Sequence, residues 1–167
     1  QEKRKSKMKM KPSSRHSAAD IAMTAAGFLG LSAVTGYIAI KWASIPEEIP
    51  SHYNMAGEVD AMGGKGLLIF LLITAWGLWV MLGAVTLILK VCDADAGIGV
   101  DQRKQEKNNR MLKTMVELLK LFLAVAFIYI IVCTITARSL GWYFIPLFLI
   151  SIFGTIIVSV TRILRNQ

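Results

Sequence analysis

Long blocks of apolar residues, separated by shorter polar stretches, form most of this chain. Four blocks approach or exceed the roughly 20 residues that a helix needs to cross the hydrocarbon core of a bilayer. They cover about residues 21–43, 67–89, 114–137 and 142–161. The apolar runs are nearly continuous and do not alternate with polar positions, which predicts helices and not the strands of a membrane barrel. The expected fold class is therefore all-α, an integral membrane four-helix bundle over residues 21–167.

The composition agrees with a membrane protein. Hydrophobic residues make up 54% of the 167 residues and charged residues only 18%. A small soluble domain must expose a large share of its residues to water and could not bury so many apolar side chains. The first block is too long for the core of a signal peptide, and no small-x-small cleavage pattern follows it, so we expect it to remain as a span.

The distribution of charge predicts the orientation. The net charge is +8, and basic residues cluster in a tail over residues 1–20, in the stretch 90–113 and near the C-terminal end. Lys65 is the only lysine or arginine in the stretch 44–66, and Arg138 is the only one in the connection after the third span. Because basic segments stay on the cytoplasmic side, we expect both termini and a cytoplasmic loop 90–113 inside, and an outer loop 44–66 outside. The expected localisation is the bacterial cytoplasmic membrane, as a multi-pass protein.

The same features limit the expected partners. The basic tail lacks interleaved aromatic residues, so we expect it to meet anionic lipid headgroups and not nucleic acid. The two cysteines, Cys92 and Cys133, fall at opposite ends of the predicted bundle, and no disulfide is expected between them.

The interiors of the spans are apolar and contain many small residues. Ala22, Ala26 and Gly30 recur every four positions in the first span, a spacing that lets helices approach closely. We expect this face to pack within one bundle, with a homodimer seam as the alternative. No charged residue lies in the middle of a span, so a coupled transporter is not expected. Glu117 and Lys120 are three positions apart, the spacing of a facing pair on a helix, and are interpreted as residues of the inner membrane boundary.

The first half of the outer loop has a strongly restricted backbone. Pro46 and Pro50 favour an extended path as the chain leaves the first span. Ile45, Ile49 and Tyr53 follow one another at four-residue spacing. This spacing predicts that they pack on the outer rim of the bundle.

The second half of the outer loop predicts a turn and a return to the membrane. Residues 54–57 are typical of a turn, in which Gly57 is free to adopt a positive φ. Gly63 and Gly64 then permit a tight bend into the second span. An outer loop specified in this way is expected to be ordered, and ordered loops often hold functional residues.

Residues 45–65 resemble a bacterial membrane domain of unknown function whose signature is L-P-x-x-I-P-x-H-[FY]-N-x-x-G-x-x-D-x-x-G-x-K. The matching residues are Pro46, Pro50, His52, Asn54, Gly57, Asp60 and Lys65, and Ile45 stands where the family usually has Leu. The same domain opens the SdpI-type proteins, which include immunity proteins against a secreted killing peptide and generally continue with further spans. The resemblance implies an outward-facing motif and a role in immunity or sensing.

The outer loop is therefore the candidate site. The residues singled out for ligand or partner recognition are Pro46, Pro50, His52, Tyr53, Asn54, Gly57, Glu58, Asp60 and Lys65. Three interpretations of these residues are open. They form a recognition surface for a secreted peptide or partner membrane protein, they bind Zn²⁺ or Ca²⁺, or they act as a structural clamp. In the clamp, His52, Asn54 and Asp60 bond the loop backbone and Lys65. The spacing fits no established metal signature, so recognition is favoured and no metal or other cofactor is expected.

The rest of the chain offers little catalytic chemistry. It contains no zinc-protease motif, nucleophile elbow or phosphate-binding glycine loop. Asp93 opens a stretch that resembles a calcium loop, but Gly97, Ile98 and Lys104 stand where an EF-hand needs an oxygen ligand, a glycine and an acidic residue. Residues 102–119 combine an apolar stripe with charges, which predicts an amphipathic helix at the headgroups or a docking site for a cytoplasmic partner.

Together these features predict a non-enzymatic bacterial membrane protein. Its outward loop is expected to recognise an extracytoplasmic ligand or partner, in the manner of SdpI-like immunity and sensing. An auxiliary subunit of a larger, transporter-type membrane complex is the alternative. A metal-dependent membrane enzyme that acts through the outer loop is the third hypothesis.

Overall fold

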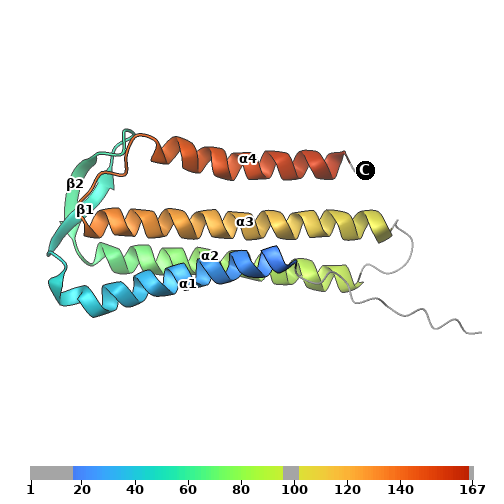
Figure 1. Cartoon of the computed structure of the whole chain (residues 1–167), viewed down its shortest axis with the longest axis horizontal. Coiled ribbons are helices and arrows are strands. Elements are labelled where there is room, and N and C mark those ends of the chain that lie inside the picture. Colours follow the sequence, from blue (N-terminus) through green and yellow to red (C-terminus); the bar gives the residue numbers. More distant parts are fainter. Residues whose placement is uncertain (1–16, 96–101, 166–167) are drawn as a thin grey trace, which may run out of the picture.

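The computed structural model describes residues 17–95 and 102–165. It is mostly helical, and its elements are α1 (Ala18–Lys41), the short 3₁₀ helix η1 (Trp42–Ser44), β1 (Glu48–Tyr53), β2 (Val59–Gly64), α2 (Leu67–Asp95), α3 (Gln102–Ile135) and α4 (Phe144–Leu164). Four of the described helices are long and apolar enough to cross a membrane, as expected for a multi-pass membrane protein. Figure 1 shows the helices lying side by side, with the two strands at one end of the bundle. We call this the hairpin end.

Helix α1 begins where its sequence provides a cap. The side chain of Asp20 accepts a hydrogen bond from the backbone N–H of Ser17 at 3.1 Å, and the Ser17 hydroxyl accepts one from the N–H of Ala19 at 3.3 Å. These two residues form a reciprocal capping box, which satisfies N–H groups that the first helical turn leaves without partners. Asp20 is itself buried, so the cap also connects α1 to the interior of the bundle.

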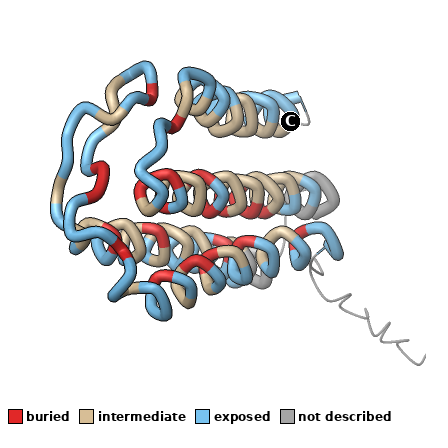
Figure 2. The backbone as a smooth tube through the Cα atoms, turned by 60° about the vertical axis from the view of Figure 1, so that its left-hand side comes forward, coloured by how far each residue is buried: buried red, intermediate tan, exposed pale blue. Residues whose placement is uncertain are grey.

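Helix α3 is the centre of the bundle. It packs against α1, α2, α4 and β1, whereas α1 and α2 meet each other only sparsely. Figure 2 shows buried backbone positions along α3 and along the inward side of α1. One apolar cluster lies at mid-bundle around Leu31, Ala75 and Ala124. A second lies at the hairpin end and joins the strands to the helices; it consists of Val34, Ile38, Ile45, Ile49, Leu68 and Ile131.

Small residues of α1 are used for packing within the chain, as expected. A Cβ atom placed on Gly30 would lie 2.8 Å from the side chain of Ile128, and one placed on Gly27 would lie 3.1 Å from Nε1 of Trp79. The two glycines therefore let α3 and the indole of α2 approach α1 closely. By contrast, Ala22 and Ala26 are exposed, so the four-residue face is only partly covered by this chain.

The outer loop differs from the all-α expectation. Residues 48–53 and 59–64 pair as a two-stranded antiparallel sheet. Gly63 and Gly64 lie within β2, and the bend into α2 occurs instead at Lys65 and Gly66. The loop is a β-hairpin because its backbone groups bond across the two strands, which sequence periodicity did not reveal.

The helices are also longer than the apolar blocks. Helix α2 continues to Asp95 and α3 begins at Gln102, so most of the expected cytoplasmic loop 90–113 is helical. The amphipathic stretch 102–119 is thus the first half of α3 itself. The basic residues before position 17, the expected cap at Asp101 and the glycines of the calcium-like stretch lie outside the described residues.

Candidate functional site

The hairpin contains two irregularities that place His52 beside Asp60. Strand pairing shifts register between Pro50 and His52 and again between His52 and Tyr53. Such bulges redirect side chains from their regular alternation. Nδ1 of His52 lies 2.6 Å from Oδ1 of Asp60, and both side chains are accessible, at 68% and 41% exposure. The result is a solvent-facing imidazole–carboxylate pair on the outer surface of the hairpin.

The turn of the hairpin is built around Asn54. Its side-chain oxygen accepts hydrogen bonds from the N–H groups of Ala56 at 2.9 Å and Glu58 at 3.0 Å. Its backbone N–H and C=O also bond across the turn, to the C=O of Glu58 and the N–H of Gly57. A short polar side chain that bonds its own backbone in this way stabilises a turn locally. Asn54 is therefore a structural residue of the site.

Gly57 joins this turn to the connection between α3 and α4. Its φ is +76°, a conformation that other residues rarely adopt. A Cβ atom here would lie 2.7 Å from the carbonyl oxygen of Gly141, and the C=O of Gly57 accepts a hydrogen bond from the N–H of Leu140 at 2.8 Å. The turn thus rests against a segment more than 80 residues away in sequence.

Apolar residues hold the first strand on the bundle. Ile45 and Ile49 are buried in the cluster at the hairpin end, as their spacing predicts, and Pro50 is fully buried beside them. The hydroxyl of Tyr53 lies 3.2 Å from that of Thr134 on α3. Burial raises the pKa of Tyr53, an effect that the Thr134 hydrogen bond partly offsets.

The two ends of the hairpin are tied to each other by Lys65. Its backbone N–H donates to the C=O of Glu47 at 2.9 Å, and Nζ lies 2.6 Å from the carboxylate of the same residue. The ammonium also stands 5.3 Å above the ring of Trp42. Lys65 thus closes the base of the hairpin and does not contact His52 or Asp60, contrary to the clamp considered above.

The sequence-predicted residues therefore separate into two groups. Those that face inward or shape the backbone are Pro50, Tyr53, Asn54, Gly57 and Lys65. The exposed members are Pro46, His52, Glu58 and Asp60. Sequence analysis did not single out Met55 and Met62, two apolar side chains of the hairpin with exposed fractions of 82% and 53%. Exposed large apolar side chains beside polar groups are typical of binding surfaces.

Comparison with known families identifies the segment that contains the hairpin. Residues 28–78 match the family model described as Domain of unknown function (DUF1648). A DUF1648 domain is found here. It comprises the second half of α1, the hairpin and the first part of α2. No curated protein and no solved structure matches the chain.

The geometry of the DUF1648 hairpin does not assemble a metal-ligand set. Zinc and calcium sites require three or more protein ligands around the ion. Among the side chains that the structure describes, no three His, Cys, Asp or Glu gather closely enough to hold one. The pair of His52 and Asp60 stands without a third ligand of this kind.

A second group of polar side chains lies inside the bundle, where sequence analysis placed only boundary residues. Glu117 and Lys120 are 2% and 4% exposed, and their charged atoms lie 3.0 Å apart. The Glu117 carboxylate also accepts hydrogen bonds from the hydroxyls of Thr24 on α1 and Thr86 on α2. Nζ of Lys120 stands 4.6 Å above the ring of Trp79. We call these five residues the buried polar cluster.

The buried polar cluster confirms that Glu117 and Lys120 face each other, as their three-residue spacing indicates, and adds that both are buried. Its four hydrogen-bonding residues, Thr24, Thr86, Glu117 and Lys120, lie toward the ends of apolar blocks, and the two charged side chains are almost fully buried between the helices. Two hydroxyls in different spans and an acidic residue three positions before a lysine were the available signals. The sequence alone does not reveal that Thr24 and Thr86 bond to Glu117, because the three residues belong to different helices.

Proposed function

We propose that this protein is a non-enzymatic membrane protein whose hairpin recognises an extracytoplasmic ligand or partner. The observation that supports this most is that some hairpin residues fix its backbone while others remain exposed. Buried anchors and a braced turn fix its backbone, while the His52–Asp60 pair and nearby apolar side chains remain exposed. A surface held in place before binding loses little conformational freedom when a partner arrives.

The sidedness of the hairpin is part of this proposal. Of the 19 basic residues, only Lys41, Lys65 and Arg138 belong to the hairpin end or its connections. The other 16 belong to the opposite half of the bundle or to segments that adjoin it. By the positive-inside rule this asymmetry favours an outward hairpin and two cytoplasmic termini.

The chemistry of the exposed surface favours a cationic, partly apolar ligand. Glu48, Glu58 and Asp60 are acidic and exposed, and Met55 and Met62 provide flexible apolar contacts. A secreted peptide with basic and apolar side chains would complement both features. The resemblance of residues 45–65 to SdpI-type immunity proteins implies such a ligand, so we propose immunity or sensing as the role in bacteria.

A protection assay tests this function. The protein is expressed in a bacterial strain that is sensitive to a secreted killing peptide, and survival is measured against peptide dose. We expect the wild-type protein to protect, and His52→Ala and Asp60→Ala to protect less at equal membrane abundance. Arg165→Ala, an exposed change at the opposite end, is the matched control. Full protection by both hairpin variants would count against recognition by this surface.

Labelling tests the sidedness separately. In a background without the two native cysteines, Met55→Cys offers a thiol at a position that is 82% exposed. We expect a membrane-impermeant maleimide to label it in intact cells whose outer envelope has been made permeable. Labelling that occurs only after the cytoplasmic membrane is opened would reverse the proposed orientation.

A further inference from the structure

Strand β2 has one free edge. The sheet contains two strands, so each strand bonds its neighbour on one side only. Strand β1 also packs against α3, and it contains Pro50, which has no N–H to donate. Strand β2 has no buried residue and contains no proline or lysine, the residues with which proteins commonly protect an edge. In Figure 2 the buried positions of the two strands lie on β1, nearest the helices.

The register of the hairpin determines which backbone groups of β2 point away from β1. In an antiparallel pair, positions that bond the neighbouring strand alternate with positions that point away from it. Lys65 directly follows β2 and donates to the C=O of Glu47 at 2.9 Å, so Gly64 and Met62 are positions that point away. Pro50, which lies opposite Met62, fits this assignment because it has no N–H. Among the described residues, none outside the hairpin bonds these groups.

The two glycines of β2 differ in what the fold requires of them. A Cβ atom on Gly63 would lie 2.8 Å from the Cβ of Ser51, so glycine there lets β1 approach. A Cβ atom on Gly64 would meet nothing within 4 Å, and the φ of Gly64 is not positive. Glycine inside a strand often marks a place where another backbone approaches closely. Since no described part of this chain approaches Gly64, the free edge has room for a further strand.

The charge around this edge favours a basic partner. Residues 45–66 contain four acidic residues and one lysine, a net charge of −3 in a chain whose net charge is +8. Asp60 and Met62 are both exposed, so a strand laid along β2 meets one acidic and one apolar side chain. Opposite charges on neighbouring strands attract each other, and like charges repel. These charges disfavour a second copy of the hairpin and favour an extended peptide with basic and apolar residues.

We propose that an extracytoplasmic peptide binds as a third strand on the free edge of β2. This inference rests on the proposed recognition function and specifies how the peptide is held. The peptide backbone bonds the outward N–H and C=O groups of Met62 and Gly64, which provide affinity. Basic side chains of the peptide lie beside Asp60 and apolar ones beside Met62, and these contacts provide selectivity.

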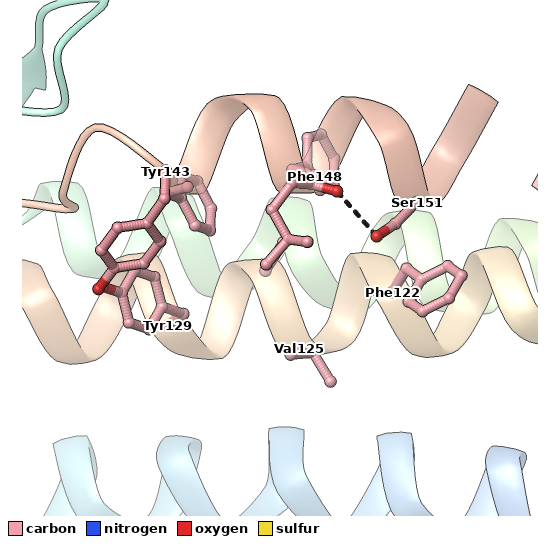
Figure 3. Close-up of a pocket in the computed structure, with 9 residues that line it drawn as sticks. Phe122, Val125, Tyr129, Tyr143, Phe148 and Ser151 are labelled. Carbon is pink, nitrogen blue, oxygen red and sulfur yellow. Dashed lines mark hydrogen bonds between the residues drawn. The ribbon is translucent and has the colours of Figure 1, made fainter. Parts of the chain in front are cut away.

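A hollow between α3 and α4 is the competing place for the apolar side chains of a peptide. It has a volume of about 210 Å³, and Figure 3 shows Tyr129 and Tyr143 together at one end of it. The hollow lies between two helices, whose backbone groups are bonded internally and offer nothing to a strand. A peptide bound there would leave the N–H groups of Met62 and Gly64 without new partners.

The probe is a fluorescent synthetic peptide of about eight residues, an ordinary strand length, in which lysine alternates with valine. Its binding to the protein in phosphatidylcholine nanodiscs is followed by fluorescence anisotropy, with empty nanodiscs as the blank. We expect the peptide to bind, and we expect a version with N-methyl groups on two consecutive central residues to bind about tenfold more weakly. The methyl groups block a hydrogen bond on each edge of the peptide and keep its side chains, and tenfold is the loss expected for one hydrogen bond.

Variants of Met62 separate its backbone from its side chain. Met62→Pro removes the outward N–H, and proline is tolerated at a strand position that does not bond the neighbouring strand. This variant should bind the peptide about tenfold more weakly. Met62→Ala is the matched control, because it keeps the N–H, and its affinity should fall less. Slow hydrogen exchange at the N–H of Lys65, which bonds Glu47, checks that the hairpin of each variant is intact.

Hydrogen exchange reports the third strand directly. With the peptide at about ten times its Kd, exchange at the N–H groups of Met62 and Gly64 should slow about tenfold, because it then proceeds only from the free protein. The N–H of Lys65 already bonds Glu47 and should change little.

Three results would overturn the inference. Equal binding of the plain and N-methylated peptides, without protection of Met62 and Gly64, would show that side chains or the hollow hold the peptide; recognition itself would stand if the protection assay succeeds. Protection of the two N–H groups without peptide, rising with protein concentration, would show that two copies pair through β2. Absence of peptide binding would remove the third strand, and recognition would fall with it only if the protection assay also fails.

Discussion

The ion pair of Glu117 and Lys120 should contribute strongly to the specific packing of the bundle. Both side chains are almost fully buried, and the carboxylate accepts hydrogen bonds from residues of three helices. Taking two charges out of water is costly, and their mutual attraction offsets that cost only while both are present. Removing one partner leaves the other as an uncompensated buried charge.

The expected effect is a strong non-additivity in a double-mutant cycle. Lys120→Met should lower the free energy of unfolding by about 3–5 kcal/mol, since the Glu117 carboxylate then keeps only the two threonine hydroxyls. Glu117→Gln should cost a similar amount, because the Lys120 ammonium then keeps only weak contacts with Thr24 and the Trp79 ring. The double variant removes both charges and should lose less than either single one.

The assay is reversible unfolding in mixed micelles, in which the fraction of denaturing detergent is raised and helix content is followed. Lys41→Met is the control, because Lys41 is an exposed residue of α1 and its replacement should change stability by no more than about 0.5 kcal/mol. Additive losses in the double variant would show that the two charges do not interact energetically. Single variants as stable as the Lys41 control would show that the pair is not buried in the folded protein.

Three further predictions concern the hairpin. Gly57→Ala should cost about 1–3 kcal/mol because of the positive φ, and should speed hydrogen exchange at the N–H of Leu140, which bonds to Gly57; unchanged exchange would refute the docking of the turn. Asn54→Ala should cost about 1–2 kcal/mol through two lost hydrogen bonds, whereas Asn54→Asp keeps the acceptor and should lose less; equal losses would contradict the role of that oxygen. The raised pKa of Tyr53 stabilises the fold below the unfolded pKa of about 10, and this contribution is lost as pH rises above that value. The decrease in the free energy of unfolding above this pH should be smaller in Tyr53→Phe than in wild type. Identical pH profiles of stability for the two proteins would refute this contribution of Tyr53.

The four spans could be predicted from sequence because lipid imposes a simple rule on them. Each apolar block must satisfy its backbone hydrogen bonds internally, so a continuous run of sufficient length becomes a helix. The hairpin did not follow from such a rule. Pro50 lies inside β1 and Gly63 and Gly64 lie inside β2, and these residues disfavour strands. The strands form because Ile49 and Tyr53 anchor one of them on the bundle.

The candidate site was predictable only where local chemistry determines structure. The roles of Asn54 and Gly57 follow from the turn preferences of asparagine and glycine. The buried polar cluster depends instead on contacts between distant positions. Thr24 lies 93 residues from Glu117 and Thr86 lies 31 residues from it, and no periodicity within one helix reveals which residues meet.

The contacts of Leu140 connect the hairpin turn to α4, the helix with no buried residue. Its N–H bonds to Gly57 of the hairpin turn, and its C=O accepts a hydrogen bond from the Tyr129 hydroxyl on α3 at 2.9 Å. Tyr129 in turn stacks on Phe144, the first residue of α4. Since α4 packs chiefly on α3, the hairpin turn is one of the few features that fix where this helix begins. The hairpin therefore presents the exposed His52–Asp60 pair and also supports the start of α4.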